Sequence, residues 1–341
     1  MSKPQRIVLA GCGGMARAWL NGLKDHPRAQ VVGLMDIRRE AAEQRKADFN
    51  LSNAATGTDL KALLAELKPD LVIDVTIPAA HKEVTLTALA AGCHVLGEKP
   101  LSDTLSNARE MIAAAQKAGK VYMVSQNYRW NPQVRALRQA VADGLLGPVS
   151  TVNVDFYIGA HFGGFRDEMA HPLLLDMSIH HFDMVRCVTQ ADPEAVYCRE
   201  FSPHGSWYKG DAATTAIFEL SGGVVFTYRG SWCSEGHNTG WNGVWRVVGP
   251  KGSIVWDGAS APVAEVVKPG AEGFTRPGDK IELALTETRP AGQVGSFERL
   301  LEAVDAGGQP ETWCGDNIKS LAMVFGAVES AERKARLPIA L

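Results

Sequence analysis

The stretch Ile7-Val8-Leu9-Ala10-Gly11-Cys12-Gly13-Gly14-Met15-Ala16 decides the fold of this chain. A short apolar run leads into Gly11, Gly13 and Ala16, which match the pattern G-x-G-x-x-A. The first glycine permits a tight turn, the second lets the backbone approach a pyrophosphate, and the small third residue lets helix and strand pack closely. Amides at the start of the following helix then face the phosphates. The stretch predicts a strand, a turn and a helix, with a dinucleotide site at the turn.

Glycine-rich turns are common, so the context of this one matters. Asp36 stands 23 residues after Gly13, at the end of a second predicted strand at residues 31–35. A carboxylate there accepts hydrogen bonds from the adenosine ribose hydroxyls and repels a 2′-phosphate, which favours NAD over NADP. Arg38 could offset part of that repulsion, so NADP stays possible. The alternative role for Asp36 is a cap at the end of a strand.

The first third of the chain alternates short apolar runs with helical patterns. This alternation predicts a parallel sheet with helices on both faces. The pattern changes near residue 126, after which alternating strands predict a sheet that is mostly antiparallel. Its expected strands are at residues 149–157, 195–201, 214–220, 224–231 and 244–248, with helices near 131–142, 174–188, 295–305 and 318–334. The prediction is an α/β protein with a Rossmann dinucleotide-binding domain at 1–125 and a substrate-binding and oligomerisation domain at 126–341.

Composition narrows the choice of partners and compartment. There are 35 Lys and Arg residues against 38 Asp and Glu residues, a net charge of −3, which argues against a nucleic-acid partner. The six cysteines include no C-x-x-C pair, which fits a reducing compartment. No apolar run approaches the length that spans a bilayer. We expect a cytoplasmic protein with no membrane partner and no bound metal.

Two segments carry residues suited to proton transfer. Glu98-Lys99-Pro100 follows a predicted strand at 94–96, and ligands bind at the carboxyl ends of parallel strands. Lys99 can accept a proton if burial and neighbouring cations lower its pKa, although a lysine there is more often simply solvated. Asp176 and His180 are four residues apart, so they share one face of a helix. A buried structural Asp–His pair and a two-histidine metal site with His181 are the alternatives.

Taken together, these motifs resemble the Gfo/Idh/MocA family, named after glucose–fructose oxidoreductase and inositol dehydrogenase. Further stretches agree with it, and the resemblance covers essentially the whole chain. They are Thr76-Ile77-Pro78 with His81, the run Tyr128-Arg129-Trp130-Asn131-Pro132, and Ser330-Ala331-Glu332.

The resemblance implies a Rossmann domain followed by a domain whose large sheet commonly forms a dimer or tetramer interface. It implies that Lys99, Asp176 and His180 form the catalytic group. His180 would be the acid or base, Lys99 would bind the substrate hydroxyl or share its proton, and Asp176 would orient the charged partner. The expected cofactor contacts are Gly11, Gly13, Gly14, Met15, Asp36, Arg38, Thr76, Pro78, His81, Glu98 and Asn127.

One departure from the family concerns the segment 162–172, where many relatives carry a glycine-rich run. Here it contains Arg166 and His171, which we expect to contact substrate together with Lys99, Asn127 and His180. A loop salt bridge is the alternative for Arg166. Trp241 or Trp245 could stack against a sugar ring, although most tryptophans in a sheet domain are core residues.

The expected function is hydride transfer between nicotinamide and a hydroxyl or keto carbon of a sugar, polyol or cyclitol. One alternative is an NAD-dependent glycosidase that acts through transient oxidation. Another is a non-catalytic regulator that senses NAD or a sugar, and the presence of Lys99, Asp176 and His180 argues against it.

Overall fold

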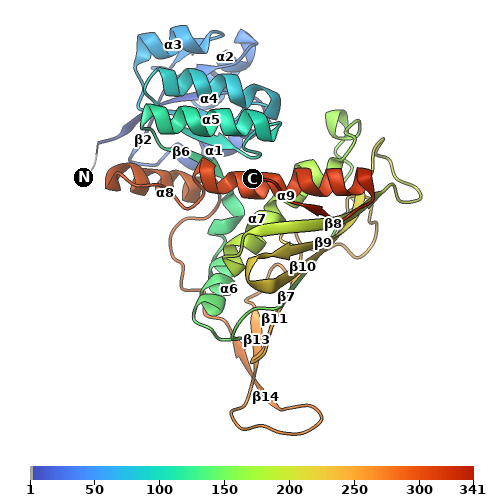
Figure 1. Ribbon diagram of the computed structural model, residues 1–341. Coiled ribbons are helices and arrows are strands. Elements are labelled where there is room, and N and C mark those ends of the chain that lie inside the picture. Colours follow the sequence, from blue (N-terminus) through green and yellow to red (C-terminus); the bar gives the residue numbers. More distant parts are fainter. Residues whose placement is uncertain (1–2) are drawn as a thin grey trace. The chain divides into compact units, whose positions relative to one another are not determined.

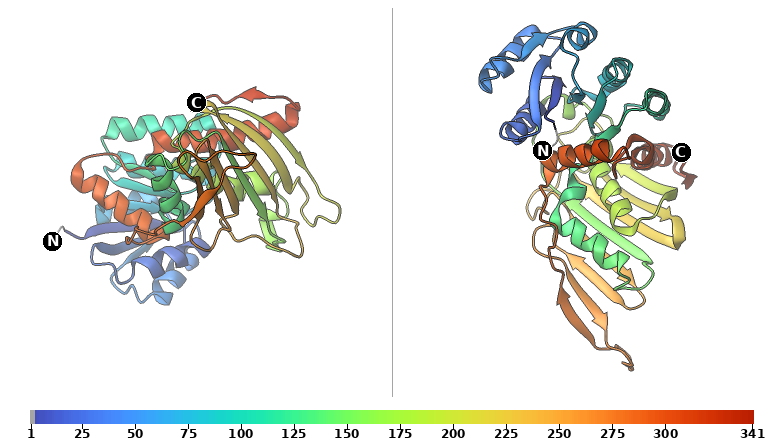
Figure 2. Two further views of the ribbon diagram at one scale, coloured as in Figure 1. Left: turned by 90° about the horizontal axis from the view of Figure 1, so that it is seen from below. Right: turned by 90° about the vertical axis from the view of Figure 1, so that its left-hand side faces the viewer.

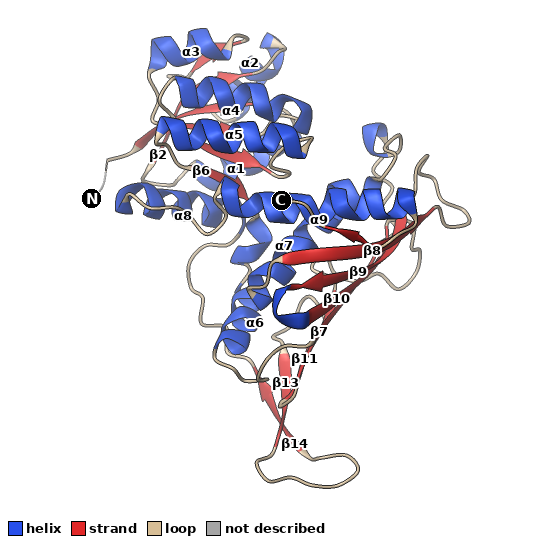
Figure 3. Ribbon diagram, in the orientation of Figure 1, coloured by secondary structure: helices blue, strands red, loops and turns tan. Residues whose placement is uncertain are grey.

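The computed structural model describes residues 3–341, which form two compact units. Unit one comprises the chain up to Asn127 together with Pro290–Leu321, and unit two comprises Tyr128–Arg289 together with Ala322–Leu341. Each unit contains both helices and strands (Figure 3). The predicted α/β class is therefore confirmed.

Unit one is built on a parallel sheet, as predicted for a Rossmann domain. Within residues 3–341 this sheet has six strands in the order β3-β2-β1-β4-β5-β6 (Figure 1). All four residues of β4 are buried, which fits a central strand covered on both faces. The strands are β1 (Gln5–Ala10), β2 (Ala29–Met35), β3 (Ala55–Gly57), β4 (Leu71–Asp74), β5 (His94–Glu98) and β6 (Tyr122–Ser125).

The helices of unit one begin and end at residues that the sequence marks. The Asp59 carboxylate accepts from the Ala62 amide at 3.1 Å, and Gly119 ends α5 with φ of 60°, a left-handed conformation suited to glycine. Buried apolar residues such as Trp19 and Met111 face the core. The helices are α1 (Gly14–Leu23), α2 (Arg39–Asp48), α3 (Leu60–Leu67), α4 (His81–Ala90), α5 (Leu105–Ala118) and α8 (Gly292–Ala306).

The segment Pro290–Leu321 belongs to unit one, whereas sequence patterning had grouped it with the second domain. The Ser296 hydroxyl in α8 lies 3.1 Å from the Ser125 hydroxyl at the end of β6. Arg28 makes two hydrogen bonds, of 2.6 and 2.9 Å, to the Asp305 carboxylate. Contacts of this kind join residues far apart in sequence, so helical periodicity could not reveal them.

Unit two contains the second sheet. Within residues 3–341 it has nine strands, ordered β14-β13-β12-β11-β7-β10-β9-β8-β15, and every neighbouring pair is antiparallel except β7 with β10. This confirms the predicted, mostly antiparallel sheet. The strands are β7 (Thr151–Tyr157), β8 (Pro193–Phe201), β9 (Ala213–Leu220), β10 (Val224–Ser231), β11 (Val244–Gly249), β12 (Gly252–Trp256), β13 (Val263–Val267), β14 (Gly278–Glu282) and β15 (Leu337–Pro338).

Helices α6 (Pro132–Ala142) and α7 (Ile179–Thr189) cover one face of this sheet (Figure 2). Phe182 of α7 packs edge-on against Phe218 at 4.8 Å and Tyr228 at 5.2 Å between ring centres. Asn131 caps α6, accepting a hydrogen bond from the Gln133 amide at 3.0 Å. The last helix, α9 (Cys314–Arg333), begins in unit one and ends in unit two.

Candidate active site

The glycine loop of unit one is shaped by close backbone approach. Gly11 has φ of +93°, and a Cβ there would lie 2.8 Å from the carbonyl carbon of Val75. Only glycine fits this position. Gly13 and Gly14 differ, because a Cβ on either would meet no heavy atom within 4 Å. Open space therefore lies beside the backbone at the start of α1, as the approach of a pyrophosphate requires.

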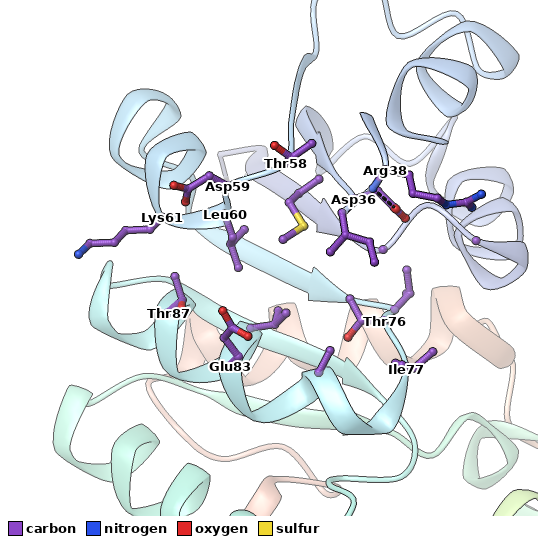
Figure 4. Close-up of a pocket in the computed structure, with 17 residues that line it drawn as sticks. Asp36, Arg38, Thr58, Asp59, Leu60, Lys61, Thr76, Ile77, Glu83 and Thr87 are labelled. Carbon is purple, nitrogen blue, oxygen red and sulfur yellow. Dashed lines mark hydrogen bonds between the residues drawn. The ribbon is translucent and has the colours of Figure 1, made fainter. Parts of the chain in front are cut away.

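A cavity of about 710 Å³ opens next to this loop (Figure 4). Five of the predicted cofactor contacts line it, namely Gly11, Gly13, Asp36, Arg38 and Thr76. Asp36 and Arg38 lie across the cavity from Thr76 and Ile77. The carboxylate of Asp36 accepts from the Cys12 amide at 2.8 Å and from the Arg38 amide at 2.9 Å. Asp36 thus acts as a local cap and also lines the cavity.

Several cavity residues were missed by motif reasoning. Ile37 and Ile77 are 86% and 67% exposed and add apolar walls, and the start of α3 contributes Asp59 and Lys61. The sequence signal that could have identified these walls is an isolated isoleucine directly after Asp36 and another directly after Thr76. An exposed apolar residue in a polar loop suits a flat ring such as adenine, because ligand pockets combine apolar walls with few polar groups.

The other predicted cofactor contacts are not among the residues that line this cavity within the described part of the chain: Gly14, Met15, Pro78, His81, Glu98 and Asn127. Two of them, His81 and Glu98, are buried and form hydrogen bonds with other side chains. Nδ1 of His81 lies 2.9 Å from the Asp74 carboxylate. Burial disfavours the charged form of His81, but the Asp74 carboxylate favours it more strongly, so the pKa of His81 is raised. Glu98 accepts from the Trp19 indole at 2.7 Å, and burial raises the pKa of Glu98.

Lys99 stands at the carboxyl end of β5, as predicted. Its backbone amide donates to the Glu98 carboxylate at 3.2 Å, and the side chain is half-buried. Burial raises the pKa of Glu98, and the nearby Lys99 side chain opposes part of that rise. The strand therefore delivers Lys99 to the edge of the sheet where ligands bind in parallel α/β folds.

Asp176 and His180 of unit two lie on a helical segment that changes type between them. Asp176 belongs to a π-helical turn, Leu173–Ser178, and His180 lies in the first turn of α7. The expected helix at 174–188 is present and continuous, but its first part is wound as a π-helix. Its periodicity could not reveal this, because a π turn has no distinct apolar pattern. Such turns occur frequently at functional sites.

Tyr128 joins this group, although the sequence singled it out only as part of a family segment. Its ring centre lies 4.3 Å from that of His180, with the planes 39° apart. Burial, with a smaller contribution from the Asp176 carboxylate, raises the pKa of Tyr128 to about 12. Tyr128, Asp176 and His180 therefore form one cluster, in which the phenol stays protonated at neutral pH.

Arg166 is directed at the same cluster. Its Nε donates to an Asp176 carboxylate oxygen at 2.8 Å, and Nη2 lies 3.5 Å from the other oxygen. The guanidinium carbon is 4.9 Å from the Phe162 ring centre and 4.8 Å from that of Phe165. The salt bridge considered as the alternative for Arg166 is present, and its partner is a candidate catalytic residue.

His171 makes a different connection. Its Nδ1 lies 2.5 Å from a carboxylate oxygen of Glu200 on β8, and the Glu200 side chain is buried. Hydrogen bonding to Glu200 raises the pKa of His171, and burial raises the pKa of Glu200. Whether His171 also contacts substrate stays a prediction.

The remaining candidates separate into core and exposed residues. His181 is buried between Phe156 and Tyr228, and burial lowers the pKa of His181 to about 3. Trp245 is buried, whereas Trp241 is 49% exposed. Within residues 3–341, no cluster of three or more His, Cys, Asp or Glu side chains could hold a metal ion. No helix in that range has the length and apolar character needed to cross a bilayer.

Comparison with known families matches both halves of the chain. Residues 5–126 match GFO_IDH_MocA, described as an oxidoreductase family with an NAD-binding Rossmann fold. Residues 134–255 match the GFO/IDH/MocA C-terminal domain.

Individual relatives are similar over nearly their full length. The 1,5-anhydro-D-fructose reductase of Ensifer adhaerens is 29% identical, with 96% of each chain covered. The D-apiose dehydrogenase of Paraburkholderia graminis is 26% identical over 95% of this chain and 87% of that protein. An oxidoreductase from Agrobacterium radiobacter, solved with NAD⁺, L-tartaric acid and magnesium, has a TM-score of 0.86 at 21% identity, covering 99% of each chain. At that identity, the structural likeness shows the fold alone.

Proposed function

Because the chain belongs to the Gfo/Idh/MocA family of NAD-binding oxidoreductases, we propose that it transfers a hydride between nicotinamide and a hydroxyl-bearing or keto carbon of a sugar, polyol or cyclitol. The protein is an NAD-dependent dehydrogenase or reductase of CH–OH groups, and the proposal concerns the substrate. Two relatives similar over nearly their whole length, an anhydrofructose reductase and an apiose dehydrogenase, act on sugars by name. Their full-length similarity includes the unit that would bind substrate.

The dinucleotide loop fits NAD in its shape and its charge. Bound NAD supplies the hydride acceptor or donor, which no side chain can replace. Gly13 would let the backbone approach the pyrophosphate, and Asp36 would accept from the adenosine ribose. Asp36 is already held by two backbone amides at the cavity, so its carboxylate needs little reorganisation to do so.

The observation that carries the catalytic proposal is the cluster of Tyr128, Asp176 and His180, with Arg166 bonded to Asp176. We assign proton transfer at the substrate hydroxyl to His180, because histidine is the side chain that most often acts as a general acid or base in enzymes. Asp176 would orient the charged partner. Tyr128 keeps its proton at neutral pH, so it can donate a hydrogen bond to a substrate oxygen.

Lys99 completes the assignment from unit one. Its position after β5 suits a group that binds and polarises the substrate hydroxyl, or that shares its proton with His180. Which of these two roles Lys99 has is a prediction that kinetic measurements decide.

The test is a measurement of NADH absorbance with a panel of sugars, polyols and cyclitols, using NAD and then NADP. Lys99→Ala and His180→Ala should each lower kcat by about 100-fold or more while NAD binding survives. Lys117→Ala and His204→Ala, at exposed positions, are matched controls that should keep full rates. Near-normal rates in both catalytic variants would show the assignment to be wrong. Release of an aglycone without net NADH would instead favour the glycosidase alternative.

We also propose that the protein forms a homo-oligomer through the sheet face of unit two that α6 and α7 leave uncovered. Strand alternation places large apolar side chains on that face, and they are unusually exposed. They are Tyr197, Phe201, Ile217, Val225, Val244 and Val255, each 39–45% exposed. Apolar side chains gathered on one exposed face are typical of protein interfaces, and the closed symmetry common in homo-oligomers would bury them against a second copy.

A further inference from the structure

Unit two contains a second cavity, of about 450 Å³, that shares no lining residue with the cluster around His180. Its walls come from α6, from the residue that follows α7, and from the segment at 286–289, which ends the first of the two stretches of unit two (Figure 1). Three guanidinium groups line it, those of Arg135, Arg138 and Arg289. Among the lining residues, Glu287 carries the one carboxylate.

Neighbouring groups hold these guanidiniums in place. Arg289 makes two hydrogen bonds to Glu287, of 2.9 and 2.7 Å. Arg138 has Nη1 3.8 Å from the Cys187 sulfur, and Arg135 lies 5.9 Å from the Trp130 ring centre. Side chains anchored in this way lose little freedom when a ligand arrives, which favours binding.

Positively charged side chains outnumber negatively charged ones among the residues that line the cavity. Three arginines against one glutamate leave two positive charges among the lining residues (3 − 1 = 2). Arg135 and Arg138 are three residues apart on one helix face, where like charges repel. Arg289 then adds a third positive charge.

From this geometry we propose that the cavity binds a small oxyanion with two or more negative charges. Guanidinium groups match carboxylate and phosphate oxygens through paired hydrogen bonds, which an ammonium group cannot reproduce. Thr286 and Gln190 add an uncharged hydroxyl and amide to the same cavity. Phosphate and polycarboxylate ligands share this chemistry, and the volume accommodates a molecule the size of pyrophosphate or citrate.

Binding there has a consequence for the chain. Glu287 and Arg289 belong to the stretch that directly precedes Pro290, where the chain returns to unit one. An anion held by Arg135, Arg138 and Arg289 joins that stretch to α6. The site therefore holds the end of the first stretch of unit two against α6, and its lining includes no residue assigned to catalysis.

The test is calorimetric titration of pyrophosphate, and separately of citrate, into the NAD-saturated protein at constant ionic strength. Saturation with NAD keeps the dinucleotide loop from binding the pyrophosphate probe. We expect saturable binding of at least one probe, and the tighter probe identifies the ligand as a phosphate or a polycarboxylate. Arg138→Gln and Arg135→Gln should each weaken Kd about tenfold or more.

Arg333→Gln is the matched control, since it removes one positive charge from an exposed arginine of the same unit. It should leave Kd unchanged. Circular dichroism checks that each variant is folded. Because two independent cavity variants are made, the test still holds if one of them fails to fold. The absence of saturable binding by either probe would overturn the proposal. So would equal weakening by Arg333→Gln and the two cavity variants.

Discussion

Replacing Arg166 with glutamine tests whether this arginine holds Asp176 in position. The ion pair joins side chains that are 34% and 18% exposed, so solvent screening limits its contribution to about 1 kcal/mol. Contacts with the Phe162 and Phe165 rings add about 0.5 kcal/mol each at a partly exposed site. The total is about 2 kcal/mol. If all of it orients Asp176, Arg166→Gln lowers kcat/KM by up to about 30-fold, because about 1.4 kcal/mol corresponds to a factor of ten.

Steady-state kinetics with saturating NAD separates this role from substrate binding. A positioning role lowers kcat and kcat/KM together, whereas a simple contact with substrate raises KM and leaves kcat unchanged. Arg166→Lys should be intermediate, since lysine keeps the charge but not the planar fork that pairs with Asp176 and stacks on the rings. Arg109→Gln, at an exposed position on α5, is the control. An Arg166→Gln enzyme with unchanged kcat would refute the positioning role.

Three further changes test the cofactor site, a buried ion pair and the oligomer. Asp36→Asn should lower the preference for NAD over NADP about tenfold in Kd, because it removes the charge that repels a 2′-phosphate; unchanged preference would contradict this. Glu200 raises the pKa of His171, so their bond stabilises the fold at acidic pH and is lost as pH rises through the raised value. His171→Gln should therefore cost about 1 kcal/mol in urea unfolding near pH 6 and less near pH 9, and an equal cost at both would count against the bond. Ile217→Asp should reduce the mass measured by light scattering, while Lys117→Ala should not.

The architecture was largely predictable, because its signals are local. The strands of unit one are short buried runs between helical patterns, and Gly11 lies where the backbone approaches Val75 too closely for any side chain. Strand β14 was missed for an equally local reason. Four of the five residues of β14 are exposed, and its sequence Gly-Asp-Lys-Ile-Glu has no apolar alternation. The placement of α8 required tertiary contacts such as Ser296 with Ser125, which periodicity does not encode.

The site residues that belong to a sequence motif were predictable. Those whose positions depend on tertiary packing were less so. Gly13 and Asp36 follow from the dinucleotide pattern, and both line the large cavity of unit one. Tyr128 carries no such signal, since a tyrosine after Asn127 in a short turn suggests nothing about its partner. Its place beside His180 depends on how the turn and α7 pack. The bond between Arg166 and Asp176 likewise depends on a loop conformation that composition does not predict.

The sequence alone does not distinguish the adjacent histidines His180 and His181 as candidates for proton transfer, whereas the surroundings of His181 in the structure do. Both ring nitrogens of His181 are near polar partners, since Nε2 lies 3.2 Å from the Trp241 carbonyl and Nδ1 3.4 Å from the Tyr228 hydroxyl. The carbonyl can only accept, so His181 carries its proton on Nε2. A pKa of about 3, caused mainly by burial, keeps this ring neutral throughout the range in which an enzyme works. His181 therefore ties α7 to the sheet and to the loop of Trp241. This structural role is why our proposal assigns proton transfer to His180, whose ring lies against Tyr128.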